Sequence, residues 1–266
     1  MLLNNILNKK KKFKNSYKDK ECFIFGNGSS IKKFDLKLFA NKLSMTCGWL
    51  YLHKDFENLN IIADFEVHPA IFFPIWKNEY TNKIEYNVPN YISKKKNRFN
   101  KSNIIFASLT NFPALFTKKN VFYLYHFGEK KINFNFINPS KKYSLMENSL
   151  YTMIGMAYFM GFKKVFLVGM DYLLDEPITG HFYEDFELKR KVDYNTYERN
   201  KYFFDFFSKY LEFTLIKTKE TSSSLINSIN YSDLFNIDEN NHKNDEIVSM
   251  EDLKLLDSAN LNYRIF

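Results

Sequence analysis

The chain has 266 residues, of which 45% are hydrophobic, and a formal net charge of +8 at pH 7. That length allows one large α/β domain, and the hydrophobic content excludes a chain that is disordered throughout. Its two cysteines, Cys22 and Cys47, lack CxxC spacing, so neither a disulfide framework nor a zinc site is indicated. No stretch reaches the roughly 18 apolar residues of a transmembrane helix. We therefore expect a cytoplasmic protein.

Most of the positive charge lies in residues 1–20, which hold seven lysines and one aspartate. Two interpretations stay open. The segment is either a solvated, flexible terminus or a basic arm on an anionic membrane surface, where each lysine contributes about 1 kcal/mol. The second interpretation places the protein peripherally on the inner face of the membrane. No motif that reads RNA or DNA accompanies the charge, so nucleic acid is not an expected partner.

Short apolar runs and longer periodic segments alternate along residues 21–238. Strands are predicted at 22–26, 43–52, 60–65, 103–109, 121–127, 164–171 and 213–218. Most of these runs are continuously apolar, as expected for strands that are covered on both faces. Helices are predicted over 30–42, 149–162 and 194–213. The alternation predicts an α/β domain with a three-layer, Rossmann-like, mostly parallel sheet.

Two further segments fall outside this alternation. Residues 172–193 contain too few periodic apolar positions for a core helix and are long for a plain connection. Loops of that length at the carboxyl ends of strands are commonly lids, so we expect a lid there. Residues 239–266 are first charged and then partly helical, which predicts a C-terminal helical tail.

Polar residues follow three of the predicted strands, at the points where those strands end. Gly26–Ser30 reads Gly-Asn-Gly-Ser-Ser between a strand and a predicted helix. Its backbone N–H groups and the Asn27 amide suit a phosphate or a ribose, although an Asn-Gly turn with a serine cap fits the same letters. Asp64 and Asp171 are expected at two other strand ends. Polar strand ends in one parallel sheet line a single crevice, which favours a nucleotide site.

Residues 146–173 resemble the bacterial lipooligosaccharide-type sialyltransferases. In that family a helix opens on Thr-Ser-Gly or a related start, ends in glycine plus an aromatic residue, and precedes a strand that closes on Gly-Ile-Asp. Here Asn148-Ser149 opens the helix, and Gly169-Met170-Asp171-Tyr172 closes the strand. The family's Gly-Asn-Gly-Pro-Ser loop is similar to Gly26–Ser30, and its serine-rich patch to Thr221–Asn227. A looser similarity links the chain to motility accessory factors and pterin diphosphokinase-like enzymes.

The resemblance implies a single GT-A-like domain that transfers a sialic-acid-like nonulosonate from a CMP-activated donor to a cell-surface glycan acceptor, with no required cofactor. Gly48 and Asp64 stand where the family has asparagines. A carboxylate beside a phosphate is repulsive unless a cation intervenes, so participation of Mg²⁺ stays open, and no metal ligand is assigned. The residues that the resemblance and the strand ends together assign to the donor are Gly26, Asn27, Gly28, Ser29, Asp64, Asn148, Ser149, Gly169, Met170, Asp171, Tyr172, Tyr183 and Ser223.

Sugar transfer needs a base that deprotonates the acceptor hydroxyl. The family has a histidine before its last long helix, and this chain has none there, so we assign the role to His181 on the expected lid, with His68 as a rival. Two other classes of function remain. An ATP-dependent pyrophosphokinase would use Asp64 and Asp171 to hold Mg²⁺. A non-catalytic nucleotide-sugar or glycan-binding module would keep the loop without needing His181. An oligomer is compatible with each of them.

Overall fold

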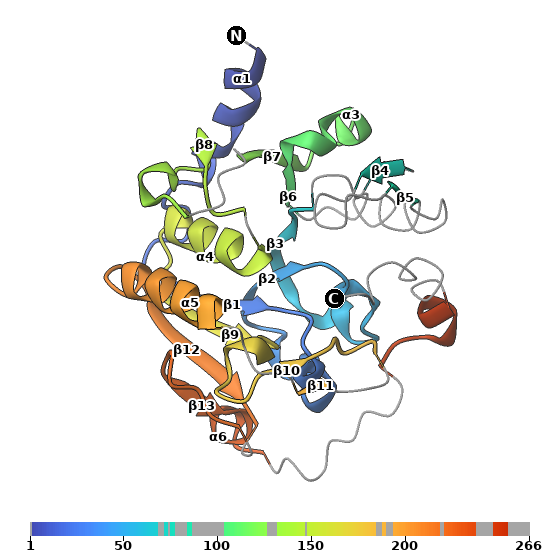
Figure 1. The fold of residues 1–266 in the computed structure, drawn as a ribbon, viewed down its shortest axis with the longest axis vertical. Helices are drawn as coiled ribbons and strands as arrows, with labels where there is room; N and C mark the ends of the chain where they lie inside the picture. Colours follow the sequence, from blue (N-terminus) through green and yellow to red (C-terminus); the bar gives the residue numbers. More distant parts are fainter. Residues whose placement is uncertain are drawn as a thin grey trace.

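A computed structural model of the protein describes residues 2–68, 72–73, 75–77, 84–86, 104–126, 132–146, 148–184, 188–189, 194–218, 221–237 and 247–254. Within these ranges, nine strands form one sheet in the order β13-β12-β9-β1-β2-β3-β6-β7-β8 (Figure 1). Neighbouring strands are parallel throughout. The predicted α/β fold with a parallel sheet is therefore confirmed.

The strands of the sheet correspond to the apolar runs in the sequence. Their bounds are β1 Glu21–Phe25, β2 Leu43–Cys47, β3 Asn60–Glu66, β6 Ile105–Ser108, β7 Val121–His126, β8 Lys142–Tyr143, β9 Lys164–Val168, β12 Glu212–Lys217 and β13 Ser228–Asn230. Two antiparallel pairs lie outside the sheet, β4 Ile75–Lys77 with β5 Ile84–Tyr86 and β10 Ile178–Thr179 with β11 Leu188–Lys189. All seven predicted strands are present.

The order of the strands reverses at β1. From β1 the chain adds strands in one direction to β8, and it then returns to place β9 on the other side of β1. Phe25, the last residue of β1, is in register with Thr46 of β2 and with Val168 of β9. The carboxyl ends of β1 and β9 therefore lie side by side at a topological switch point, where open α/β sheets bind ligands.

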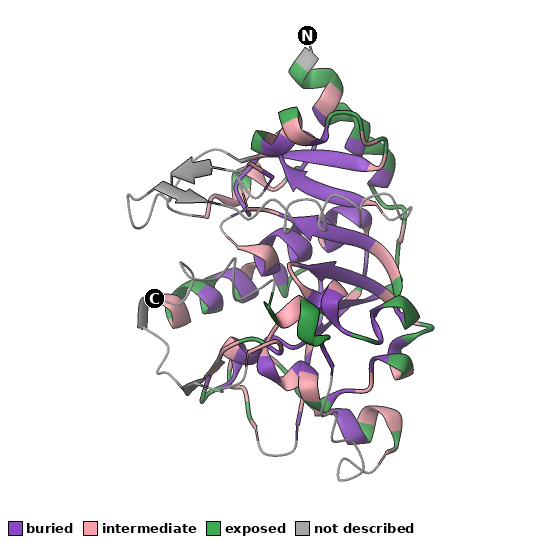
Figure 2. Cartoon of the chain, turned by 90° about the vertical axis from the view of Figure 1, so that its right-hand side faces the viewer, coloured by how far each residue is buried: buried purple, intermediate pink, exposed green. Residues whose placement is uncertain are grey.

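Two apolar layers cover the faces of the sheet. On one face α4 (Ser149–Met160) and α5 (Tyr194–Phe207) pack against Cys22 and Ile24 of β1. On the other face short 3-10 helices and α6 (Tyr231–Phe235) pack against Phe23 and Phe25. Successive β1 side chains thus enter opposite layers, as the two-residue period of a strand requires. Figure 2 shows the buried strands between these layers.

The short helices complete the fold. They are α1 Leu2–Asn8, α3 Phe112–Leu115, η1 Lys9–Phe13, η2 Ser29–Lys33, η3 Leu36–Phe39, η4 Leu50–Leu52, η5 Phe56–Asn58, η6 Leu109–Asn111, η7 Phe134–Phe136 and η8 Asp171–Leu173. None of the helices in the described ranges combines the length and the apolar character that crossing a membrane requires. Near the C-terminus, Ile247 and Val248 are buried in the apolar layer that contains Phe23, Phe25 and η2, which we call the η2-side layer. A helical turn covers residues 250–254.

The prediction of one helix over 30–42 was wrong. Two 3-10 helices, η2 and η3, occupy this stretch, because Phe34 between them is extended with φ −107° and ψ 133°. Asp35 then caps η3 by accepting a hydrogen bond from the Lys37 N–H group at 2.9 Å. This irregular path buries Ile31, Phe34, Leu36 and Phe39 together. The Gly26–Ser30 loop therefore leads into a 3-10 turn, not into the long helix that we expected behind it.

The basic N-terminal segment is folded against the sheet, so it is not the flexible terminus that its composition suggested. Phe13 packs edge-on against Phe122 with ring centroids 4.8 Å apart. Lys10 is fully buried, and its Nζ donates to the Tyr123 carbonyl. Desolvation by burial lowers the pKa of Lys10 to about 7. In Figure 1 α1 lies at the β7–β8 end of the sheet, and residues 15–19 then run along the carboxyl end of α4.

Candidate functional site

Two glycine-containing turns meet at the switch point. The Gly28 N–H group donates to the Gly169 carbonyl at 2.9 Å, and the Gly26 N–H group donates to Val168 at 2.8 Å. A Cβ atom on Gly26 would lie 2.5 Å from the Gly169 oxygen, and one on Gly28 would lie 2.7 Å from it. Both distances are shorter than any Cβ contact that a protein tolerates. The two glycines in the first turn are thus needed for the close approach of the backbones.

Asp171 holds the loop that follows β1. It lies three residues after the end of β9, and not at the last position of the strand as predicted, because Gly169 turns the chain with φ +67°. Its Oδ2 accepts the Ser30 N–H group at 2.7 Å and the Ser29 hydroxyl at 3.3 Å, and its Oδ1 accepts the Ser30 hydroxyl. Asp171 is 4% exposed and Ser29 is fully buried. A buried carboxylate is stable only when hydrogen-bond donors surround it, and these serines supply them. Asp171, the first residue of η8, therefore fixes the start of η2 from the turn that follows β9.

Asn27 connects the ends of β1 and β2. Its Nδ2 donates to the Cys47 carbonyl at 3.2 Å, and its Oδ1 accepts the Trp49 N–H group at 3.1 Å. Gly48 lies between these partners with φ +63°, and a Cβ atom there would lie 2.7 Å from Asn27 Nδ2. A glycine at position 48 thus permits both the left-handed backbone and the close approach of the amide. Asn27 shapes the crevice by orienting the β2 end.

The segment expected to be a lid lies against this loop. Phe182 donates its N–H group to the Asn27 carbonyl at 3.0 Å, and His181 forms an isolated antiparallel bridge with Gly28. The Phe182 side chain is 1% exposed and belongs to the η2-side layer. Residues 172–184 of the expected lid are described, together with 188–189. These contacts place the expected lid against the Gly26–Ser30 loop. That the segment opens and closes stays a prediction.

His181 is held in a defined orientation beside Gly28. Its Nδ1 lies 3.2 Å from Glu184 Oε1, and its backbone N–H group donates to Glu184 Oε2 at 2.8 Å. The ring stacks on Tyr183 with centroids 4.9 Å apart and planes 4° apart. The His181 side chain is 49% exposed. A carboxylate at Nδ1 favours the tautomer in which Nε2 can accept a proton, so this pair has the arrangement of a general base.

The amino terminus of α4 points to the same edge of the sheet. Because α4 precedes the parallel strand β9, it runs against the strands and begins at their carboxyl ends. Asn148 caps it, its Oδ1 accepting the Tyr151 N–H group at 2.8 Å, and Ser149 is its first residue. Both side chains are half-buried. Unpaired N–H groups and the helix dipole make this end suitable for a phosphate.

Asp64 does not lie at a strand end, in contrast to the prediction. The strand β3 continues to Glu66, so Asp64 lies inside the strand and is 4% exposed. Its Oδ1 accepts the Thr46 hydroxyl at 3.0 Å and the Phe65 N–H group at 3.1 Å. In the described ranges, no group of three or more His, Cys, Asp or Glu side chains has the arrangement of a metal site.

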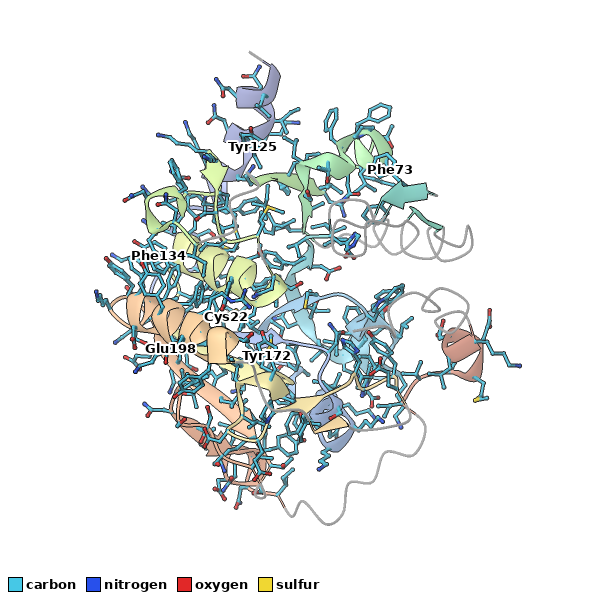
Figure 3. The ribbon with its side chains drawn as sticks, viewed as in Figure 1. Cys22, Phe73, Tyr125, Phe134, Tyr172 and Glu198 are labelled. Carbon is cyan, nitrogen blue, oxygen red and sulfur yellow. The ribbon has the colours of Figure 1, made fainter. Side chains whose placement is uncertain are left out.

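A separate cavity of about 390 Å³ adjoins Tyr172 on the α5 side of the sheet. Ser223 reaches this region and donates its hydroxyl to the Leu173 carbonyl at 2.7 Å. Figure 3 labels Tyr172 near the first half of α5, where Glu198 also lies. Burial raises the pKa of Tyr172, and the nearby Tyr151 and Cys47 add to that effect. Among the described residues the cavity is lined by Tyr172, Leu174, Asp175, Tyr197, Asn200, Ser224 and Leu225.

Sequence reasoning missed Asn200 and Asp175. A signal for Asn200 was present, because it is the polar residue at helical spacing from the buried aromatic residues Phe203, Phe204 and Phe207. A lone polar residue on a buried helix face must find a partner or a ligand. Asp175 carried no comparable signal, since its serine partners lie 47 and 49 residues away in the chain.

No protein-family model and no curated protein matches the chain. Two solved structures of the sialyltransferase CstII from Campylobacter jejuni are similar to it, one in complex with cytidine-5'-monophosphate and one with CMP-3FNeuAc. The first is 16% and the second 15% identical to this chain. Each match covers 74% of this chain and 80% of the other, with a TM-score of 0.40.

Proposed function

We propose that this protein is a glycosyltransferase that uses a CMP-activated, sialic-acid-like nonulosonate and a cell-surface glycan acceptor. One observation carries the proposal: the Gly26–Ser30 loop and the Gly169–Asp171 turn meet at the topological switch point, beside the orienting pair of His181 and Glu184. Nucleotides bind at this place in open α/β sheets. The loop and the turn belong to two of the sequence blocks that resemble the sialyltransferases.

The chain offers two groups for the nucleotide in this proposal. The amino terminus of α4, with Ser149 as its first residue, presents N–H groups and a partial positive charge to the phosphate of CMP. The ribose in this proposal lies against the Gly26–Ser30 loop, whose glycines let the loop pack closely on the Gly169–Asp171 turn. Asn27 and Asp171 act as positioning residues, because each already bonds the protein and fixes the shape of the crevice.

His181 is the general base of the proposed reaction. The acceptor hydroxyl oxygen forms a bond to the anomeric carbon of the donor sugar, and the bond from that carbon to the phosphate oxygen breaks. CMP leaves with the electron pair, and the hydroxyl proton passes to His181 Nε2. Glu184, 3.2 Å from Nδ1, stabilises the imidazolium that results. The partial charge at the α4 terminus stabilises the developing phosphate charge.

The first test is calorimetric titration of CMP, CDP, UDP, GDP and ATP, with and without Mg²⁺, followed by turnover of CMP-N-acetylneuraminic acid. We expect metal-independent binding of CMP and release of CMP from the donor. His181→Ala should lower kcat by about 100-fold or more, the usual contribution of a general base, and leave the Kd for CMP within about twofold. His68→Ala is the matched control, because His68 is the rival base.

Three results would contradict this proposal. Selective, Mg²⁺-dependent binding of ATP would favour the pyrophosphokinase, and binding of CMP-sugar without turnover would favour the binding module. A loss of turnover in His68→Ala but not in His181→Ala would overturn the assignment of the base.

A further inference from the structure

Asn200 of α5 is a buried amide that the protein satisfies only in part. It is 2% exposed, and its Oδ1 accepts the Tyr151 hydroxyl at 2.5 Å. Its Nδ2 has no hydrogen-bond partner within the described part of the chain. A buried N–H donor without a partner is unfavourable, and native proteins seldom keep one unless something else binds it. This donor therefore points to a ligand.

Asn200 belongs to the wall of the cavity next to Tyr172. The volume of about 390 Å³ lies in the range of small-molecule pockets. Two tyrosines, Tyr172 and Tyr197, line it together with Leu174 and Leu225. It thus combines aromatic and aliphatic walls with one deeply placed polar group, the composition of a pocket that binds an uncharged organic molecule.

The described wall of the cavity carries one acidic group, and Arg199 lies near enough to the wall residue Tyr172 to offset part of the rise in its pKa that burial causes. Among its described lining residues there is no lysine or arginine, and Asp175 is the one charged group. Burial acts to raise the pKa of Asp175, but hydrogen bonds from Ser224 and Ser222 outweigh it and lower the pKa below its ordinary value. The cavity wall thus presents a hydrogen-bonded carboxylate and no lysine or arginine among its described residues, which favours a neutral ligand over a phosphate or a sugar acid. The same carboxylate can accept hydrogen bonds from hydroxyl groups.

A neutral sugar meets each of these conditions. Its hydroxyl oxygens accept from an amide such as Asn200 Nδ2, and its hydroxyl groups donate to a carboxylate such as Asp175. The apolar face of a pyranose ring packs against tyrosine rings, as Tyr172 and Tyr197 provide. We infer that this cavity, the Asn200 cavity, binds a neutral pyranose unit of the acceptor glycan. That the sugar belongs to the acceptor rests on the proposed function, whereas the binding of a neutral sugar does not.

The test is a titration of the full chain with the methyl glycosides of glucose, galactose and mannose, followed by NMR, with N-acetylneuraminic acid and CMP as anionic competitors. At least one methyl glycoside should bind saturably, and the anions should not displace it. Asn200→Asp keeps an acceptor for Tyr151 but removes the donor, and should weaken binding at least fivefold. Tyr197→Ala removes a wall and should weaken it at least tenfold. Tyr202→Ala, on the same helix with the ring 58% exposed and outside the cavity lining, is the matched control.

The inference fails if no methyl glycoside binds saturably, if Asn200→Asp and Tyr197→Ala leave binding unchanged, or if CMP or the sugar acid competes for the cavity. Should Asn200→Asp fail to fold, Tyr197→Ala decides alone, because its ring is only half-buried. Donor turnover without sugar binding would remove this inference and keep the proposed function. Sugar binding without CMP binding would keep the sugar site and remove the proposed function.

Discussion

The switch-point loop and the Asn200 cavity treat their buried polar groups in opposite ways. In the loop, Asn27 and Asp171 have protein partners for both atoms of their amide and carboxylate groups. In the cavity, Asn200 has a partner for its oxygen and, in the described residues, none for its nitrogen. A polar group whose hydrogen bonds are all made within the protein sets the shape of a site, and one with an unused donor in the wall of a cavity can bind a ligand. The comparison thus separates positioning residues from binding residues.

Asp171→Ala is expected to have the largest effect on stability, because it removes a carboxylate whose hydrogen bonds hold the switch-point loop. The variant leaves the Ser30 N–H group, the buried Ser29 hydroxyl and the half-buried Ser30 hydroxyl without their acceptor. We expect the free energy of unfolding to fall by about 2–4 kcal/mol in urea titrations followed by circular dichroism, and CMP binding to weaken. Asp175→Ala is the matched control, since Asp175 also accepts from serines but is exposed, and should cost about 0.5 kcal/mol or less. Equal losses of unfolding free energy in the two variants would contradict this expectation, because the burial of Asp171 would then add nothing to the cost of removing its carboxylate.

A medium effect is expected from Gly48→Ala. The new Cβ atom would lie 2.7 Å from Asn27 Nδ2, on a backbone with φ +63°. Strain and the displaced amide should together cost about 2 kcal/mol in the same unfolding assay. In an Asn27→Ala background the cost should fall to about 1 kcal/mol, because only the backbone strain remains. An unchanged cost in that background would mean that Asn27 is not held against Gly48.

The smallest loss of stability is expected for variants of Tyr151 and Asn200 at the Asn200 cavity. Tyr151→Phe should cost about 1 kcal/mol, because it removes the partner of Asn200 Oδ1. Adding Asn200→Leu to that variant should cost less than about 0.5 kcal/mol, since the Asn200 side chain then has no hydrogen bond left to lose among the described residues. Unfolding in urea measures both steps. A second loss above about 2 kcal/mol would show that Asn200 is there for stability, and the ligand argument would weaken.

Part of the site was predictable because it depends on neighbours in the sequence. A continuous apolar run that ends in Gly-Asn-Gly specifies a buried strand and a tight turn locally, and the same holds for the run that ends at Gly169-Met170-Asp171. The parallel sheet then brought the two strand ends together. By contrast, Asp64 also follows an apolar run but no glycine precedes it, and it lies inside its strand because β3 continues to Glu66. Local pattern does not determine the last residue of a strand.

Seven strands of the sheet, their parallel arrangement and the glycine-rich turn at Gly26–Ser30 could be predicted from local pattern, since they follow from apolar patterning and backbone sterics. The hydrogen-bond partners of the polar groups became known from the three-dimensional structure alone. The buried Lys10 ammonium donates a hydrogen bond to a carbonyl 113 residues later, and Asp171 accepts hydrogen bonds from serines 141 and 142 residues before it. Such partners are distant in the chain, and a hydrogen bond in a low-dielectric interior is strong enough to hold them there once the packing of the strands has brought them together.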